Sequence, residues 1–159
     1  MEPRFLVDAM LGKLARWLVI LGYDAAFAGA DGRSDLELLR QAQSEGRVFV
    51  TKDRRIPEVA GLRMVVLVAQ GHEEQLGELA KALSLKPDPA LLFSRCTDCN
   101  EKLASLSREE ALPLVPPKVR TLDTSFWRCP KCGKLFWNGT HVDRILATLR
   151  RAGLSATPK

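Results

Sequence analysis

Short apolar runs alternate with amphipathic segments through the first half of the chain. The apolar runs have the length and composition of buried strands, and they span residues 4–7, 24–28, 47–51 and 62–68. The segments between them carry apolar side chains at helical spacing and span residues 11–21, 34–46 and 73–83, with a shorter helix predicted over 54–60. Strands that alternate with helices across short connections indicate a parallel sheet covered by helices. We therefore predict an α/β fold.

Local signals mark the ends of the predicted helices. Ser34 and Glu37 have the spacing of a capping box, in which each side chain accepts a hydrogen bond from the other residue's backbone amide. Gly46 stands where that helix is expected to stop, and Gly22 stands at the end of the preceding one. The predicted helix over residues 34–46 therefore has a signal at each end.

The periodic pattern stops at residues 86–89, which read Lys-Pro-Asp-Pro. Beyond them, cysteine pairs, prolines and scattered aromatic residues replace the helical and strand periodicities. We predict an α/β domain over residues 1–86 and a smaller module over residues 87–159. A closing helix is expected over residues 140–149 with Thr140 as its N-cap, and the last residues, 155–159, are expected to fray.

The positive charge of the chain is concentrated in the second module. The formal net charge is +5. Residues 1–86 hold 12 basic and 12 acidic side chains, whereas residues 87–159 hold 12 basic and 7 acidic ones. A basic module suits a polyanionic partner such as nucleic acid, although ordinary surface charge explains it equally well. The chain contains no apolar run of about 18 residues and no signal-peptide pattern near Met1, so we expect no membrane span and a cytoplasmic location.

Four cysteines stand in the second module as two pairs, each with two residues between the thiols. They are Cys96 with Cys99 and Cys129 with Cys132. In a reducing compartment such pairs indicate a structural zinc site with four thiolate ligands. Two disulfides are the alternative, and His141 is a possible replacement for one cysteine. The 29 residues between the pairs predict a strand-rich insert.

Acidic residues follow the apolar strands of the first domain. Asp8 ends the first predicted strand and Asp53 follows the third, so both are expected at the carboxyl edge of a parallel sheet. Asp35 lies in the first turn of the intervening helix, and Asp31 lies in the loop before it. Each residue has a simpler explanation as a helix cap. Converging carboxylates repel one another unless a cation lies between them, and oxygen ligands select Mg²⁺ or Mn²⁺. The pattern therefore predicts a divalent-ion site that hydrolyses a phosphodiester.

Basic side chains accompany these acidic residues. Lys13 and Arg16 share one face of the first predicted helix, which begins beside the first aspartate. Lys52, Arg54 and Arg55 flank the aspartate that follows the third strand. All five are candidates to bind substrate phosphates, or they form a solvated surface.

Cations and aromatic residues are interleaved in the second module, a composition that suits single-stranded RNA. The cations are Arg95, Lys118, Arg120, Arg128, Lys131 and Lys134, and the aromatic residues are Phe126, Trp127, Phe136 and Trp137. We expect the two phenylalanines to form the small core of the module and one of the two tryptophans to be exposed.

Several of these segments together resemble the Mut-seven C-terminal RNase family of PIN-like nucleases. The matching segments are 5–18 (FLVDAMLGKLARWL), 21–24 (LGYD), 50–54 (VTKDR), 95–100 (RCTDCN), 126–133 (FWRCPKCG) and 137–141 (WNGTH). The resemblance implies a PIN-like α/β domain with a C-terminal zinc ribbon that hydrolyses RNA. It implies catalytic metal-ligand roles for Asp8 and Asp53, with Asp35 as the second acidic site and Asp31 as its rival. A fourth acidic residue, common in PIN domains, is not apparent.

Two alternatives to a nuclease remain at this point. A non-catalytic RNA-binding or assembly module would keep the zinc ribbon and an eroded acidic site. The second alternative is a phosphatase of the haloacid dehalogenase type. That class needs a second aspartate two residues after the first, and the presence of Met10 at this position counts against it. RNA is the expected partner, and the sequence leaves open a protein inhibitor or a second copy of the chain.

Overall fold

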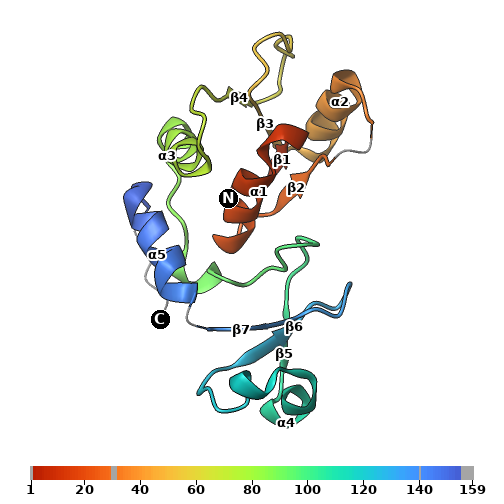
Figure 1. Ribbon diagram of the computed structural model, residues 1–159. Coiled ribbons are helices and arrows are strands. Elements are labelled where there is room, and N and C mark those ends of the chain that lie inside the picture. Colours follow the sequence, from red (N-terminus) through yellow and green to blue (C-terminus); the bar gives the residue numbers. More distant parts are fainter. Residues whose placement is uncertain (1, 30–31, 140, 155–159) are drawn as a thin grey trace.

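A computed structural model of the chain describes residues 2–29, 32–139 and 141–154 (Figure 1). The first half forms β1 (Phe5–Val7), η1 (Ala9–Leu11), α1 (Gly12–Ile20), β2 (Ala25–Phe27), α2 (Asp35–Glu45), β3 (Val48–Thr51), β4 (Met64–Val66) and α3 (His72–Leu83). The four strands pair in parallel in the order β2-β1-β3-β4. The predicted α/β fold, a parallel sheet flanked by helices, is therefore confirmed.

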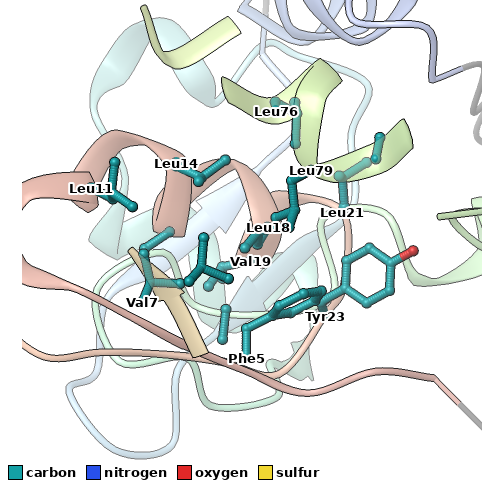
Figure 2. Close-up of a cluster of buried hydrophobic side chains, with 14 of the residues drawn as sticks. Phe5, Val7, Leu11, Leu14, Leu18, Val19, Leu21, Tyr23, Leu76 and Leu79 are labelled. Atoms are coloured by element: carbon teal, nitrogen blue, oxygen red, sulfur yellow. The ribbon is translucent and has the colours of Figure 1, made fainter. Parts of the chain in front are cut away.

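Alternate residues of the central strands point to opposite faces of the sheet, and each face is covered by helices. Phe5 and Val7 of β1 face α1 and α3, where Leu14, Leu18 and Leu79 are fully buried (Figure 2). The other face of the same strands packs against α2. Both faces are therefore apolar, which is why the strand sequences contain few polar residues.

Local chemistry sets the ends of the helices as predicted. The Ser34 hydroxyl accepts a hydrogen bond from the Glu37 amide at 3.2 Å, and the Glu37 carboxylate accepts one from the Ser34 amide at 3.2 Å. Gly46 ends α2 in the left-handed conformation. Gly22 has φ +93°, and a Cβ built there would lie 2.4 Å from the Leu91 carbonyl oxygen. Glycine at position 22 thus permits both the turn after α1 and the close approach of residue 91.

The helix predicted over residues 54–60 does not form. These residues make a turn and an irregular loop. The Arg55 amide donates to Asp53 Oδ1 at 2.9 Å, which closes a local turn. Pro57 then disfavours helical backbone at the residue before it and provides no amide. The strand predicted over 62–68 is shorter, because only Met64–Val66 pairs with β3.

The second half contains a three-stranded antiparallel sheet in the order β5-β6-β7. Its elements are η2 (Pro89–Leu91), β5 (Ala104–Leu106), α4 (Arg108–Ala111), η3 (Leu112–Leu114), η4 (Pro117–Val119), β6 (Phe126–Arg128), β7 (Leu135–Trp137) and α5 (His141–Arg151). Between the cysteine pairs the chain forms β5, then three short helical elements, then β6. More of these residues are helical than extended, so the prediction of a strand-rich insert is wrong. The prolines at 113, 116 and 117 favour these turns over further strands.

The closing helix α5 packs into the core of the first half. It lies beside α3 (Figure 1), and Leu149 is fully buried among the residues of α1 and α3. Arg151 forms an ion pair with Glu73 of α3 at 3.0 Å. The predicted boundary at residue 86 remains a prediction, and apolar packing crosses it. Thr140, the expected cap of this helix, and residues 155–159 lie outside the described residues.

Within the described residues, no helix is long and apolar enough to span a membrane.

Candidate active site and metal centre

The carboxyl edge of the parallel sheet brings Asp8 next to Thr51. Val7 of β1 pairs with Val50 of β3, so the next residue of each strand lies at the same edge. The Asp8 amide donates to the Val50 carbonyl at 3.0 Å, and the Thr51 hydroxyl donates to Asp8 Oδ2 at 2.8 Å. The other oxygen, Oδ1, accepts from the Ala9 amide at 2.7 Å. Both carboxylate oxygens of Asp8 are therefore held by neighbours.

Asp53 joins the same arrangement through Thr51. Its backbone amide donates to the Thr51 hydroxyl oxygen at 3.0 Å. Its carboxylate pairs with Arg55, whose Nε lies 3.1 Å from Oδ1. The side-chain hydrogen bond from Arg55 is the main reason that the pKa of Asp53 is lowered. Asp53 is therefore ionised at neutral pH, with Arg55 as its cationic partner.

Asp35 reaches the same edge from a different element. In a crossover between parallel strands the helix runs back over the sheet, so the first turn of α2 lies near the carboxyl ends of the strands. The pKa of Arg55 is raised, chiefly by its hydrogen bond to Asp53 and in smaller part by the charge of Asp35. Asp31, the rival to Asp35, lies outside the described residues.

The three aspartates do not form a closed ion cage. Among the described residues, the four cysteines are the one group of three or more Cys, His, Asp and Glu side chains whose ligand atoms come close enough to hold an ion. Instead, the Thr51 hydroxyl links Asp8 to the backbone of Asp53. The side chain of Arg55, which is 91% exposed, forms an ion pair with the Asp53 carboxylate. The edge thus provides anionic oxygens, with the exposed Arg55 guanidinium paired to one of the carboxylates.

The predicted phosphate-binding cations occupy different places. Lys13 is exposed in the first turn of α1, and Arg54 is exposed in the turn after β3. Lys52 donates to the Gln70 side chain at 2.8 Å. Arg16 points instead to the second half of the chain, where it lies 3.8 Å from Asp98. Of the five predicted cations, Arg55 pairs with Asp53 and Arg16 faces the cysteine-containing module. The other three are close in sequence to Asp8 or Asp53.

The four cysteines gather into a single cluster. Their sulfurs all lie within 4.8 Å of one another, and none of the four is in a disulfide. Four sulfurs at the usual Zn–S distance of about 2.3 Å in a tetrahedron are about 3.8 Å apart. Cys96 and Cys132 have that separation, 3.8 Å between sulfurs. The cluster can therefore bind a metal such as zinc, and His141 is not among its members.

The two cysteine pairs have the same backbone geometry. The Cys96 amide donates to the Glu101 carbonyl at 2.8 Å, and the Cys129 amide donates to the Lys134 carbonyl at 2.9 Å. Asn100 and Gly133 occupy equivalent positions with φ of +64° and +78°. The sequence pointed to the second turn through its proline and glycine, whereas the first turn uses asparagine at the left-handed position.

Asn100 also fastens the first cysteine turn to the parallel sheet. Its side-chain nitrogen donates to Asp24 Oδ1 at 2.7 Å, and its oxygen accepts from the Ala25 amide at 3.1 Å. Arg95 adds hydrogen bonds to the carbonyls of Gly22 and Asn100 at 3.2 and 2.8 Å. Three of these four contacts join residues more than 70 positions apart in the chain, which is why the sequence did not predict them.

The thiols of the cluster do not all ionise readily when no cation lies among them. The pKa of Cys99 is raised, first by its hydrogen bond to Cys132 and then by burial. Burial also raises the pKa of Cys129, but the amides of Cys132 and Lys131 outweigh burial and lower it. A cation among the four sulfurs relieves the repulsion between thiolates, which is why such clusters bind metal tightly.

Residues 3–149 match the family model described as the Mut7-C RNAse domain. The chain belongs to this family. The resemblance seen in the sequence is thereby confirmed over nearly the whole chain, and the Mut7-C RNAse description indicates a nuclease-like function on RNA. A search of curated proteins and a search of solved structures each find no match.

Proposed function

We propose that this Mut7-C protein is a Mg²⁺- or Mn²⁺-dependent ribonuclease that hydrolyses RNA phosphodiester bonds at the carboxyl edge of its parallel sheet. The supporting observation is the hydrogen-bonded series Asp8–Thr51–Asp53, which holds two aspartates at the ends of neighbouring strands. In parallel α/β sheets, ligands bind at this edge, beyond the carboxyl ends of the strands. Family membership supplies the substrate class.

The donor set fits a hard divalent cation. Asp8 and Asp53 would hold the ion through carboxylate oxygens, with Asp35 as a further ligand from the start of α2. A divalent ion supplies electrostatic stabilisation of the phosphate oxygens and activation of water. Arg55 already balances the charge of Asp53, so it would have to leave that carboxylate when the ion binds. Thr51 keeps Asp8 in a fixed orientation throughout, because its hydroxyl donates to Asp8 Oδ2.

The remaining residues at the edge have roles in binding the strand. Lys13 in the first turn of α1 and Arg54 next to Asp53 are exposed and would pair with phosphates that flank the scissile bond. Lys52 would do so after exchanging its hydrogen bond to Gln70. In the reaction, a water oxygen bonds to phosphorus, the bond to the leaving nucleoside oxygen breaks, and the proton ends on that oxygen. We also propose that the four-cysteine cluster binds a structural Zn²⁺.

The test is cleavage of an unstructured RNA by wild-type protein and Asp8→Asn, each with and without Mn²⁺. We expect at least a 100-fold loss of rate in the variant, because a metal ion held by fewer carboxylates gives up a large part of its stabilisation of the transition state. Asp123→Asn is the matched control, because Asp123 is exposed and makes no ion pair with a described residue. Equal cleavage by wild type and Asp8→Asn, with both proteins folded, refutes the proposal.

A second candidate is a non-catalytic RNA-binding module. The ion pair between Arg55 and Asp53 favours it, since that pair neutralises one of the proposed ligands. RNA binding by the wild type without any Mn²⁺-dependent cleavage would select this function over the first.

A further inference from the structure

A pocket of about 300 Å³ lies where α1, the first cysteine turn, the β6–β7 hairpin and α5 meet. The side chains that matter for its chemistry are Arg16, Arg95, Trp127, Lys134, Phe136 and His141. Its size is at the lower end of the range of small-molecule sites, enough for one flat ring system. It lies apart from the acidic edge, and the function proposed above does not use it.

The register of the β6–β7 hairpin shows which of its aromatic residues share a face of the sheet. Trp127 pairs directly with Phe136, and Phe126 pairs with Trp137. Directly paired residues of an antiparallel ladder point to the same face of the sheet. Phe126 and Trp137 pack in the core of the β5–β7 sheet with Val115. Trp127 and Phe136 therefore present their rings on the opposite face of the sheet and line the pocket, and the partly buried Trp137 lines it as well. This corrects the expectation that Phe136 is a core residue.

The lining of the pocket is cationic as well as aromatic. Arg16, Arg95 and Lys134 contribute positive charge, and no acidic residue is among the described residues that line it. The Lys134 ammonium lies 5.4 Å from the centre of the Phe136 ring. Arg95 binds only carbonyl oxygens, so its charge is not neutralised there. A ligand that combines a flat ring with negative charge matches this lining.

One acidic residue, Asp98, lies at the margin of the pocket and forms ion pairs with two of its cations. Asp98 accepts a hydrogen bond from the Lys134 ammonium at 3.0 Å and lies 3.8 Å from the Arg16 guanidinium. All three side chains are substantially exposed, so water and salt weaken these pairs. A phosphate that reached this point would compete with the Asp98 carboxylate for the same two cations.

A second hollow extends from this pocket along α1 to the start of that helix. It is lined by Gly12 at the start of α1, by Phe27 at the end of β2, and by Asp98. Arg16 and Thr97 line both hollows, so the two are adjacent. From Gly12 to Ile20 the helix α1 advances about 12 Å. The hollows thus follow α1 from the neighbourhood of Asp8 to the aromatic pair.

We propose that this path is the binding groove for an unpaired RNA strand, and that Trp127 and Phe136 hold one unstacked nucleobase while Arg16 and Lys134 bind an adjacent phosphate in place of Asp98. The proposal rests on the proposed function, because it assigns the same substrate to a second site about 12 Å along α1 from the acidic edge. Stacking on aromatic rings and pairing of phosphates with cations are the two interactions by which proteins hold single strands.

The experiment measures the affinity of a fluorescein-labelled, single-stranded oligoadenylate by anisotropy, without Mg²⁺ or Mn²⁺, so that binding is separated from cleavage. Trp127→Ala is expected to weaken binding at least about fivefold, the lower limit for removal of one stacking partner. Trp127→Phe should stay within about threefold of the wild type, because the stacking face is retained. Asp98→Asn should bind about fivefold more tightly, because one like charge about 4 Å from the phosphate is lost.

Two controls separate the groove from general effects. Lys134→Ala should weaken binding clearly more than Lys118→Ala, which removes an exposed cation remote from the groove on η4. Zinc content and circular dichroism check that each variant is folded. The proposed groove is refuted if Trp127→Ala binds RNA with unchanged affinity. It is also refuted if Asp98→Asn binds RNA no more tightly than the wild type. Trp127-dependent binding in a protein that never cleaves RNA would support the groove and refute the nuclease.

Discussion

Asp24 is the residue through which the acid stability of this protein can be tested most sharply. Its carboxylate accepts hydrogen bonds from Arg47 at 2.7 Å, from Asn100 at 2.7 Å and from Arg4 at 3.2 Å. Partial burial raises the pKa of Asp24, but these hydrogen bonds outweigh burial and lower the pKa from 3.8 to about 2. Arg47 is itself only 8% exposed, so loss of the carboxylate leaves a buried guanidinium with weaker partners.

The size of the effect follows from the shift in pKa. A difference of nearly two pKa units corresponds to about 2 kcal/mol of folding free energy. Because the pKa is lowered on folding, this stability is fully present above pH 3.8 and is lost as the pH falls toward 2. We therefore expect Asp24→Asn to be less stable than the wild type by about 2 kcal/mol at pH 7, with a melting temperature about 4–8 °C lower. The two proteins should become nearly equal only near pH 2 and below.

Urea unfolding of the wild type and Asp24→Asn between pH 7 and pH 2 measures this difference directly. The comparison removes effects common to both proteins, such as loss of a bound metal in acid. Asp123→Asn is the control for a carboxylate without an ion pair, and it should match the wild type throughout. A stability difference between wild type and Asp24→Asn that does not change with pH would refute the assignment of the effect to the ionised carboxylate.

Two further predictions concern the proposed metal sites. Arg55→Ala should lower the Mn²⁺ concentration needed for half-maximal RNA cleavage severalfold, because Asp53 loses the cation that competes for its carboxylate. A titration of cleavage rate with Mn²⁺ measures this, and an unchanged or higher Mn²⁺ requirement would contradict it. Purified protein should contain one zinc per chain. Cys129→Ser should lose both the zinc and the near-ultraviolet circular dichroism of Trp127 and Trp137. A variant that keeps the dichroism without zinc would show that the metal does not maintain the β5–β7 sheet.

The parallel sheet could be predicted because its signals are local. Each strand is a short apolar run, and each helix between strands has its own apolar face and end signals, such as the capping box of Ser34 and Glu37. The cysteine cluster was predictable for the same reason, since two close pairs of thiols specify one tetrahedral site. Short-range patterns thus account for the fold class and for the cysteine site.

The features that escaped prediction depend on contacts between distant residues or on competition between local signals. Pro57 and the side chain of Asp53 replace the expected helix with a turn. The faces of Trp127 and Phe136 could not be assigned, because a three-residue strand has too few positions to reveal an alternation. A capping signal predicted the closing helix, but the burial of Leu149 among residues of α1 and α3 depends on how that helix packs against them.

The acidic edge could be predicted only in part. Strand ends placed Asp8 and Asp53 correctly at one edge, because parallel strands share their carboxyl ends. The intermediate position of Thr51 depends on the register between β1 and β3, which the sequence does not specify. The direction of Arg16 toward Asp98 depends on how the cysteine-containing module docks on α1.

The most direct test of the central claim is the location of Mn²⁺ by anomalous diffraction from crystals of the wild-type protein grown with that ion. We predict a peak at the carboxyl edge of the parallel sheet, within about 2–2.5 Å of carboxylate oxygens of Asp8 and Asp53, with Arg55 turned away. Anomalous density confined to other parts of the molecule, with Arg55 still paired to Asp53 at a saturating Mn²⁺ concentration, would contradict it.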